Sequence, residues 1–539
     1  MQLTKKTLFK PDTFAGKYLL KNKAIASYYD YDWEDAQGRA EELADLNFQR
    51  DKITDAIQDF QHKNFPCEKS FVQAERLRRN DSIAVVGGQQ AGFLTGPLYT
   101  VHKIISILTE AERLEKKLNQ PVLPVFWIAG EDHDIDEINH TYFHENNEVK
   151  KIRIWERNDI KKPASERIID KEAAREAVLT GLKHLSETND TKIIKEALLE
   201  DIKEELTYTS WCAKILYRLF KGTGLIVMDA HDPVVREMEA PYFEEMVDRN
   251  EEIRNAFHSQ ADMFRRDGFG EPVAVEKENA HLFLHQNQER LLLHSENGEW
   301  WLKNEGEKWT TAELKRKISL ESGPLSNNVV TRPLMQDLIL PVHTFIAGAG
   351  ELQYWALLKN VFHLFGHQMP IVKPRHSLTL VSRKSEKTLD QYQLQLDNIL
   401  ESGTKEIRIK RVEKAKAADS KQLFQKAETA IVNDLQDVAK TLGNENSLNH
   451  IHARYEERFK RLIQEYEAGI EKAVERQEGV HLSRLSAIEA ELFPEGQKQE
   501  RCLNILPFLN QGGLDFVPRL LAHVREQEDG MPSHFVNFI

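Results

Sequence analysis

Residues 82–97 read SIAVVGGQQAGFLTGP, and this stretch decides the fold. Residues 82–86 are short, apolar and followed by glycine, as expected of a strand buried on both faces. Four glycines fall between Gly87 and Gly96, and an amphipathic helix is predicted from about Pro97 to Leu118. A second apolar strand is expected at residues 121–129. Together these segments form a βαβ unit, which predicts a parallel sheet and an α/β core.

Length and composition limit the class of protein. The chain has 539 residues, which at roughly 150 residues per domain predicts either about three to four domains or one large core with insertions. Acidic residues outnumber basic ones by 86 to 73, giving a net charge of −13, which argues against a protein that binds the nucleic-acid backbone. No apolar run is long enough for a membrane span, and the N-terminus lacks the apolar region of a secretory signal. Three cysteines, far apart in the sequence, fit a reducing compartment. We expect a cytoplasmic protein that binds neither nucleic acid nor membranes.

The core is expected to span residues 1–385 with two inserted connective modules. Further core strands are predicted at residues 225–229 and 370–373, the latter as the last strand. The insertions are placed at about 140–210 and 250–320, because the charged and alternating stretches there are too long for loops.

Each insertion has its own expected structure. In the first, residues 151–155 read as a strand and residues 171–206 as helical. In the second, residues 272–302 alternate between apolar and polar side chains, which is typical of antiparallel strands, and Glu296–Glu299 reads as a hairpin turn.

Residues 386–493 predict a long antiparallel α-helical coiled-coil domain. They contain no proline, and apolar residues from Phe424 to Leu442 recur every three or four positions. Gly443-Asn444 interrupts this pattern, and a similar seam resumes from Tyr455 to Val480. A narrow apolar seam on an exposed hairpin predicts a homodimer, although such a hairpin can also pack only on itself. Residues 494–539 are expected to pack back on the core.

The glycine-rich stretch is the first candidate binding site. Glycines between a buried strand and a helix N-terminus allow close approach to a ligand, and exposed helix amides favour a phosphate or carboxylate. The spacing fits neither the phosphate loop of ATPases nor the dinucleotide fingerprint, so neither class is predicted. The alternative is a tight turn without a ligand. The residues expected to bind here are Gln89, Gln90, Gly92, Thr95 and Gly96.

The second candidate follows the strand at residues 121–129. Ligands of open α/β sheets bind at the carboxyl ends of strands, and Asp132-His133-Asp134 provides an imidazole that a neighbouring carboxylate can orient as a general base or acid. The alternative for His133 is a buried, hydrogen-bonded histidine. Asn139 and His140 follow, and His144 would share a helix face with His140 as a metal pair, although this spacing is common by chance. No set of metal ligands is predicted.

Three further segments carry polar groups. His231 lies at the end of the strand at residues 225–229. Arg332, with Gln336 nearby, is suited to clamping a carboxylate or phosphate, the alternative being a structural ion pair. Residues 348–351 open a helix that carries Tyr354. A weaker anion site for a nucleotide is predicted at Ser382, Arg383, Lys384 and Ser385, where the alternative is a solvated run of charges.

Four motifs are similar to those of a known family. Residues 88–99 (GQQAGFLTGPLY), 125–134 (VFWIAGEDHD), 332–337 (RPLMQD) and 350–355 (GELQYW) resemble the BshC family. The resemblance covers essentially the whole chain. It implies a Rossmann-type core with connective insertions and a coiled-coil domain used for dimerisation. It also implies the last step of bacillithiol biosynthesis, in which cysteine is joined by an amide bond to the sugar amine of glucosaminyl malate.

This activity requires an activated carboxylate, because amide formation from a free carboxylate in water is uphill. ATP is the expected source, as in class I aminoacyl-tRNA synthetases, although the sequence contains neither a His-x-Gly-His nor a Lys-Met-Ser-Lys-Ser motif, and no cysteine-rich zinc site. A metal requirement is open. The rival interpretations are a synthetase-like nucleotidyltransferase with another substrate and a non-catalytic dimeric scaffold.

Roles for the candidate residues follow from this interpretation. His133, oriented by Asp132 or Asp134, is expected to deprotonate the attacking amine, with Gln90 beside it. Arg332 and residues 348–351 are expected to anchor the malyl carboxylates. The full substrate-binding set predicted is Gln89, Gly92, Thr95, Gly96, His102, Asn139, His140, His231, Arg332, Gln336, Gly350, Glu351 and Tyr354.

Overall fold

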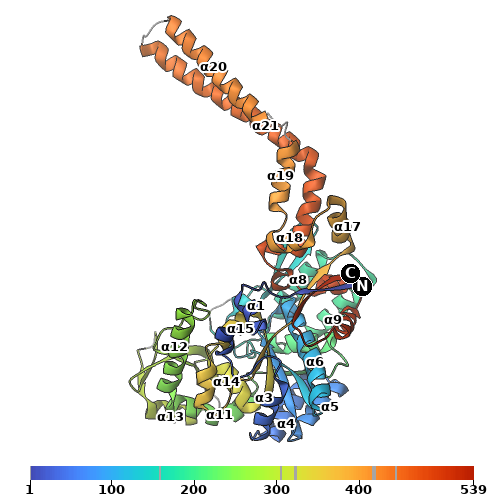
Figure 1. Ribbon diagram of the computed structural model, residues 1–539, viewed down its shortest axis with the longest axis vertical. Helices are drawn as coiled ribbons and strands as arrows, with labels where there is room; N and C mark the ends of the chain where they lie inside the picture. Colours follow the sequence, from blue (N-terminus) through green and yellow to red (C-terminus); the bar gives the residue numbers. More distant parts are fainter. Residues whose placement is uncertain (1, 157–159, 304–305, 321–323, 416–419, 443–445) are drawn as a thin grey trace. The chain divides into compact units, whose positions relative to one another are not determined.

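The computed structural model describes residues 2–156, 160–303, 306–320, 324–415, 420–442 and 446–539. The chain forms two compact units. The core unit consists of Met1–Phe143, Lys150–Val381 and Gln499–Ile539, and the helical unit of His144–Val149 and Ser382–Lys498. The main boundaries therefore fall after Val381 and Lys498, where the sequence placed them after residues 385 and 493. Figure 1 labels helices of both units.

A five-stranded parallel sheet forms the centre of the core unit. Its strands are β2 (Ile83–Gln89), β3 (Val122–Ile128), β6 (Ile226–Asp229), β12 (Val342–Ala347) and β13 (Ile371–Pro374). Their spatial order is β13-β12-β2-β3-β6, and every neighbouring pair is parallel. This is the order of a doubly wound Rossmann sheet, in which the direction of winding reverses between β2 and β12. The predicted α/β, Rossmann-like fold class is confirmed.

The first two glycines of the decisive stretch belong to a strand rather than to a loop. β2 continues to Gln89, and Gly87 and Gly88 pair with Phe126 and Trp127 of β3. A Cβ atom on Gly88 would lie 2.9 Å from the carbonyl oxygen of Trp127, so the close approach of the backbone requires glycine. The 3-10 turn η2 (Phe93–Thr95) follows, and α6 (Tyr99–Leu118) begins two residues later than predicted.

Helices surround this sheet. The elements that precede β2 in the sequence are β1 (Gln2–Thr7), α1 (Phe14–Leu19), α2 (Lys23–Ala26), α3 (Ala36–Ala44), α4 (Arg50–Asn64), α5 (Glu68–Glu75) and the 3-10 turn η1 (Arg76–Arg78). Later helices of the core unit are α10 (Tyr208–Leu219), α14 (Thr331–Ile339), α15 (Ala349–Trp355) and α16 (Lys359–Leu364).

The first insertion follows α7 (Ile135–Ile138) and contains β4 (His140–Glu145), β5 (Glu148–Arg153), α8 (Lys171–Lys183) and α9 (Asn189–Asp201). The predicted strand and helices are present. The interpretation of His140 and His144 as neighbours on a helix is wrong, because these residues lie on a strand. Burial alternates along this strand, with Thr141 and Phe143 buried and Tyr142 and His144 half-buried, but the residue types do not alternate between apolar and polar, so the sequence carries no strand signal here.

The second insertion is built around an antiparallel sheet. It comprises α11 (Pro233–Asp248), α12 (Asn250–Arg266), β7 (Asn279–Gln286), β8 (Glu289–Glu296), β9 (Glu299–Leu302), β10 (Lys308–Thr310), α13 (Thr311–Leu320) and β11 (Leu325–Asn327). The sheet order is β10-β9-β8-β7-β11. The predicted hairpin turn at Glu296–Glu299 is confirmed, and its two central residues, Asn297 and Gly298, have positive φ angles.

β13 is not the last strand. β14 (Ser377–Val381) and β15 (Ser533–Phe538) form a second sheet with β1, in the order β1-β15-β14. The two ends of the chain thus pair with each other. The helices α22 (Gln499–Cys502), α23 (Leu506–Gly512) and α24 (Phe516–Glu526) precede β15 and belong to the core unit.

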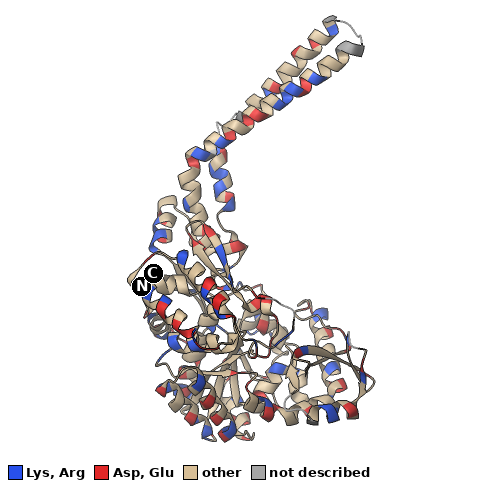
Figure 2. Ribbon diagram, turned by 180° about the vertical axis from the view of Figure 1, so that it is seen from behind, with Lys and Arg blue, Asp and Glu red and all other residues tan. Residues whose placement is uncertain are grey.

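The helical unit contains α17 (Arg383–Tyr392), α18 (Leu396–Ser402), α19 (Lys405–Ala415), α20 (Ser420–Leu442), α21 (Asn446–Leu492) and the 3-10 turn η3 (Pro494–Gly496). α20 and α21 lie side by side, with the rings of Phe424 and Tyr466 5.3 Å apart. The predicted break at Gly443-Asn444 lies outside the described residues. Lys and Arg are interspersed with Asp and Glu along both helices (Figure 2). No helix in the described part of the chain combines the length and apolar character of a membrane span.

Candidate active site

A cavity of about 630 Å³ opens at the carboxyl ends of β2 and β3, beside β12. This is the point where the winding of the sheet reverses, the usual ligand position in such folds. Residues of β7, β8 and the segment after β11 form the facing wall. The lining residues are Gly88, Gln89, Gln90, Trp127, Ala129, Glu131, Asp132, His133, Asp134, Glu137, Asn279, Phe283, Arg290, Leu292, Asn327, Asn328, Val329, Arg332, Gln336, Phe345 and Glu351.

The structure brings the predicted catalytic residues together at this cavity. Gln90, Asp132, His133 and Asp134 all line it, as do Gln89, Arg332, Gln336 and Glu351 from the predicted substrate-binding set. Segments up to about 260 residues apart therefore meet at one place, as the sequence predicted from their position at strand and helix ends.

Asp132 organises the end of β3. Its Oδ1 accepts the backbone N–H of His133 at 2.8 Å, and its Oδ2 accepts the Gln90 side-chain amide at 2.8 Å. Burial alone would raise the pKa of Asp132, but the hydrogen bond from Gln90 and the charge of Arg290 lower it below its ordinary value. Asp132 is thus an ionised acceptor that shapes the turn, and it makes no hydrogen bond to the His133 ring.

His133 has a different partner from the one predicted. Arg290 Nη1 lies 3.1 Å from His133 Nδ1, and because a guanidinium can only donate, Nδ1 accepts. The neutral ring then carries its proton on Nε2. Burial and the positive charge of Arg290 lower the pKa of His133. The expectation that Asp132 or Asp134 orients His133 as a base is therefore wrong: Asp134 instead accepts the backbone N–H of Asp136 at 3.1 Å and caps α7.

Arg290, which the sequence reasoning missed, is the anchor of the facing wall. Its Nε donates to Ser326 Oγ at 3.0 Å and its Nη2 to the Asn327 carbonyl at 2.5 Å. The guanidinium lies over the Phe283 ring, 3.7 Å from its centroid. The only sequence signal was an arginine within the alternating pattern of β8, which does not reveal that the strand faces a ligand cavity.

Arg332 is half-buried and lines the cavity from α14. Among the described residues, no carboxylate lies within the 4.0 Å of an ion pair from its side chain. Burial alone would lower its pKa, but the neighbouring Tyr354 hydroxyl, with which it shares a hydrogen bond, and the charges of Glu131 and Glu351 raise it. The alternative interpretation of Arg332, a structural ion pair, is thus not found among the described residues, and its guanidinium is available to a ligand.

The polar groups of the turn at residues 348–351 have hydrogen-bond partners within the protein. The Gly348 N–H donates to Glu351 Oε2 at 2.6 Å, and the buried Lys103 donates to the same oxygen at 2.6 Å and to the Gly88 carbonyl at 2.7 Å. Gly350 does not line the cavity. This turn is therefore not free to anchor a ligand carboxylate. Lys103 was missed because it follows the glycine-rich stretch as an ordinary helix residue.

Two of the amides in the glycine-rich turn are bonded within the turn itself. The Gly92 N–H donates to the Gln90 carbonyl and the Gly96 N–H to the Phe93 carbonyl, both at 2.9 Å. Asn504 donates to the carbonyls of Leu94 and Gly96, which fixes the turn to the C-terminal segment. Thr95 is buried, and neither it nor Gly92 or Gly96 lines the cavity. The Gly92 and Gly96 amides, which were predicted to bind an anion, are therefore bonded within the turn, whereas the buried Thr95 hydroxyl has no hydrogen-bond partner in the described part of the chain.

Other predicted substrate-binding residues lie away from the cavity. His102 is buried and pairs with Glu500 at 3.0 Å. Asn139 is buried and contacts the ring of His140 at 3.3 Å. His231 pairs with Glu166 at 2.7 Å. Tyr354 reaches the cavity only through Arg332.

The predicted anion site at the start of α17 is occupied by a side chain of the same unit. Glu491 accepts hydrogen bonds from the Ser382 N–H at 2.7 Å, the Ser382 hydroxyl at 2.7 Å and the Ser385 hydroxyl at 2.9 Å. Arg383 and Lys384 are exposed. The helix N-terminus does bind an anion, but that anion is a buried carboxylate of the protein.

Comparisons with known proteins agree with this architecture. Residues 1–376 match the model described as "Bacillithiol biosynthesis BshC, N-terminal Rossmann-like domain", and residues 378–531 match "Bacillithiol biosynthesis BshC, C-terminal coiled-coil domain". A protein of Bacillus licheniformis is 33% identical over 522 residues, covering 96% of this chain and 97% of the relative. One of Bacillus cytotoxicus is 34% identical over 511 residues, covering 94% of each. Both relatives are named "Putative cysteine ligase BshC".

Proposed function

The chain belongs to the BshC family of bacillithiol biosynthesis, and from this premise we propose that it is a ligase that joins cysteine to glucosaminyl malate through an amide bond. The new bond links the carboxyl carbon of cysteine to the nitrogen of the sugar amine. The proposal locates this reaction in the cavity at the ends of β2 and β3.

The observation that carries the proposal is the pair of guanidinium groups in one cavity. Arg332 has no carboxylate partner among the described residues, and Arg290 faces the same space. The positive charge of Arg332 contributes to lowering the pKa of Arg290, after the larger effect of burial. A bound dianion relieves this repulsion, and the malyl group of glucosaminyl malate supplies two carboxylates.

Carboxylates line the adjoining side of the cavity. Asp132, Asp134 and Glu137 line it near α7, and Gln90 bridges two of them by donating to Asp132 and to Glu137. This side suits an amine or ammonium group. The cavity thus combines a basic wall, which suits carboxylates, with an acidic wall, which suits an amine, and the two walls meet where Arg290 Nη1 lies 3.8 Å from Asp132 Oδ1. This combination matches an acceptor that carries both groups.

His133 lies between these walls as a hydrogen-bond donor. Because Nδ1 accepts from Arg290, the Nε2–H is the group that the ring offers to a ligand. We assign it to an oxygen of the substrate, in place of the base predicted from the sequence. Asp134, which is exposed at the cavity, is the candidate acceptor for a proton from the amine.

ATP-dependent activation is proposed on energetic grounds alone. The two stretches that the sequence offered for phosphate are Gly92–Gly96 and Ser382–Ser385. The Gly92 and Gly96 amides and the Ser382 and Ser385 hydroxyls are bonded within the protein, and Thr95 does not line the cavity. No nucleotide site is assigned, and no step is derived through the nucleotide.

The assay is purified protein with cysteine, glucosaminyl malate and ATP. We expect the thiol product together with AMP if the carboxylate is adenylated, or ADP if it becomes an acyl phosphate. Exchange of pyrophosphate into ATP that does not depend on cysteine would favour the nucleotidyltransferase alternative. If no product forms with ATP, with another nucleotide or without a nucleotide, the ligase assignment is contradicted, whether or not the protein binds glucosaminyl malate.

We also propose a cytoplasmic homodimer formed through α20 and α21. Tyr455, Phe459 and Tyr466 are 47%, 38% and 63% exposed in the single chain, although they belong to the apolar seam. A second copy is the natural cover for such a seam. Light scattering is expected to give twice the monomer mass, and a Phe459→Glu, Tyr466→Glu variant is expected to be monomeric; a wild-type monomer at micromolar concentration would contradict this.

A further inference from the structure

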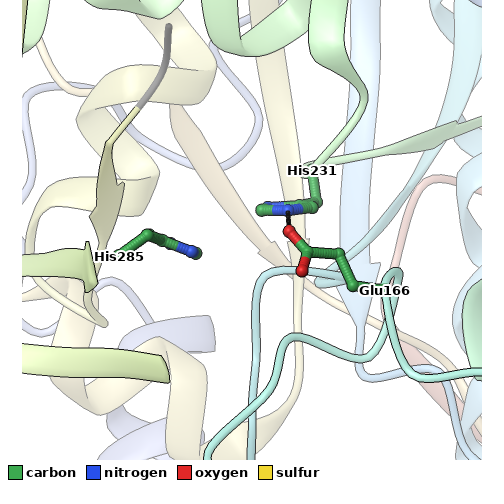
Figure 3. A group of neighbouring side chains, drawn as sticks. All are labelled: Glu166, His231 and His285. Carbon is green, nitrogen blue, oxygen red and sulfur yellow. Dashed lines mark hydrogen bonds and ion pairs between the residues drawn. The ribbon is translucent and has the colours of Figure 1, made fainter. Parts of the chain in front are cut away.

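We propose that Glu166, His231 and His285 form a binding site for a divalent transition metal ion of the zinc class. The proposal goes beyond the ligase reaction and does not depend on it. Figure 3 shows the three side chains, with the Glu166 carboxylate at the edge of the His231 ring and the His285 ring directed toward this pair.

The three residues come from parts of the chain that the fold brings together. Glu166 lies in the first insertion between β5 and α8, His231 follows the end of β6, and His285 lies on β7 of the second insertion. Hydrogen bonds hold this arrangement: the His231 N–H donates to Asp229 at 2.9 Å, and the His285 N–H donates to the Pro324 carbonyl at 2.7 Å. A metal ion here would connect the central sheet to both insertions.

The spacing suits a metal ion. One ligand atom from each residue lies within 4.8 Å of the other two, and His231 Nε2 is 2.7 Å from Glu166 Oε1. Zinc binds nitrogen and oxygen at about 2.0–2.2 Å, so ligand atoms in a tetrahedral site are roughly 3.3 Å apart. The Glu166–His231 contact must open slightly and the contacts to His285 must close, which needs side-chain rotation only.

The second histidine is prepared to act as a ligand. Metal binding uses the neutral imidazole, in which one ring nitrogen carries a proton and the other offers a lone pair. Its Nε2 contacts Ser326 Oγ at 2.8 Å. With Nδ1 on the metal, Nε2 carries the proton and donates to that hydroxyl, the kind of outer partner that orients metal-binding histidines.

The same hydroxyl connects the proposed metal site to the substrate cavity. Ser326 Oγ also accepts from Arg290 Nε at 3.0 Å, and Arg290 donates to His133. An oxygen with two lone pairs can accept from both His285 and Arg290. Metal binding would therefore hold the orientation of Arg290 without touching the cavity, since none of its three ligands lines it.

The donor set also distinguishes this cluster from ordinary histidine–carboxylate pairs. His363 pairs with Asp30 at 2.9 Å and His376 with Glu528 at 2.8 Å, but within the residues that the structure describes only Glu166, His231 and His285 form a group of three suitable ligands. Two nitrogens and one carboxylate oxygen, with Glu166 43% exposed, match a zinc site whose remaining position is open to water.

The test is calorimetric titration of the metal-stripped, full-length protein with Zn²⁺ alone. We expect about one equivalent bound with micromolar or tighter affinity, and at least tenfold weaker binding in Glu166→Gln and in His285→Ala. His363→Ala is the matched control and is expected to bind like wild type. Glu166→Gln changes one partly exposed atom, so its folding, checked by circular dichroism, is expected to be unchanged.

Two results would overturn the proposal: no specific binding to the wild-type protein, or equal binding in wild type, Glu166→Gln and His285→Ala. Co²⁺ substitution gives a second readout, because the visible spectrum of bound Co²⁺ is expected to change in Glu166→Gln and not in His363→Ala. Neither readout requires turnover, so failure of the ligase assignment and failure of the metal site are distinguishable.

Discussion

The sequence predicts an anion-binding site both in the cavity of the core unit and at the N-terminus of α17 in the helical unit. The two sites differ in whether the protein itself supplies the anion. At α17, Glu491 takes the Ser382 N–H and both serine hydroxyls. In the cavity, Arg332 faces open space with no described carboxylate within ion-pair distance. Basic and hydroxyl groups near a helix start therefore predict an anion, but only the tertiary structure decides whether it is a ligand or part of the protein.

The first way to sharpen this contrast is to remove the internal anion. Glu491→Ala leaves one buried and two partly buried donors without an acceptor. At about 1–3 kcal/mol for each such group, reduced by water entering the gap, we expect a loss of about 3 kcal/mol in the free energy of unfolding of the helical unit. Denaturant titration measures this loss. Phosphate is expected to recover part of it.

The exposed Glu495→Gln is the control for this change, and its stability is expected to stay within about 0.5 kcal/mol of wild type. If Glu491→Ala were equally neutral, the carboxylate would not be the partner that this helix terminus requires.

Acid provides a second test, because the core unit buries a neutral histidine, His343, in its central sheet. Burial lowers the pKa of His343 to about 4, because the charged ring would lose its hydration there. Its Nε2 donates to the Ala36 carbonyl at 2.8 Å. Above pH 6.5 the ring is neutral in both the folded and unfolded states, so its titration has no effect on stability. Below pH 6.5 only the unfolded state takes up the proton, and stability falls by about 1.4 kcal/mol per pH unit until the folded pKa is reached.

We therefore expect His343 to cost the core unit about 2 kcal/mol at pH 5 relative to pH 7. His343→Gln keeps a side-chain donor for the Ala36 carbonyl and is expected to lose this part of the pH dependence. Unfolding curves at pH 7, 6 and 5 measure the difference. Identical pH dependence in the variant and wild type would show that this histidine does not titrate on unfolding as described.

The smallest expected effect concerns His133. As a neutral donor through Nε2 it contributes about 1 kcal/mol, so His133→Ala is expected to lower kcat/KM about fivefold. The remaining activity is expected to depend on pH as the wild-type activity does. A histidine with a lowered pKa is already neutral near pH 7, so its titration does not change the activity in that range.

A general base in this position would behave differently. Its removal would cost about 10²–10⁴ in rate and would abolish a limb of the pH profile. That outcome would restore the role expected from the sequence and contradict the assignment of Nδ1 as the acceptor of Arg290.

These cases show which features of the molecule could be predicted from the sequence. Apolar runs ending at glycine or aspartate located the central strands, and the ends of those strands located the cavity, because both depend on local pattern and on the topology of parallel sheets. Gln90, His133 and Arg332 therefore meet where the sequence placed them.

The partners of these residues could not be predicted in the same way. Arg290 is 157 residues from His133, and Glu491 is 109 residues from Ser382. The sequence offered Asp132 and Asp134 as partners for His133 because they are its neighbours, but both carboxylates bond to backbone amides of their own turn. Local pattern does not specify which distant side chain satisfies a polar group.

The most direct test of the central claim, that Arg332 is held open for a substrate carboxylate, is calorimetric titration of glucosaminyl malate into wild-type protein, Arg332→Gln and Arg383→Gln. Loss of a charge-assisted, two-pronged contact of about 3–4 kcal/mol is expected to weaken binding to Arg332→Gln by roughly 10²–10³. The exposed Arg383→Gln is expected to bind like wild type. Equal affinity in all three proteins would contradict the claim.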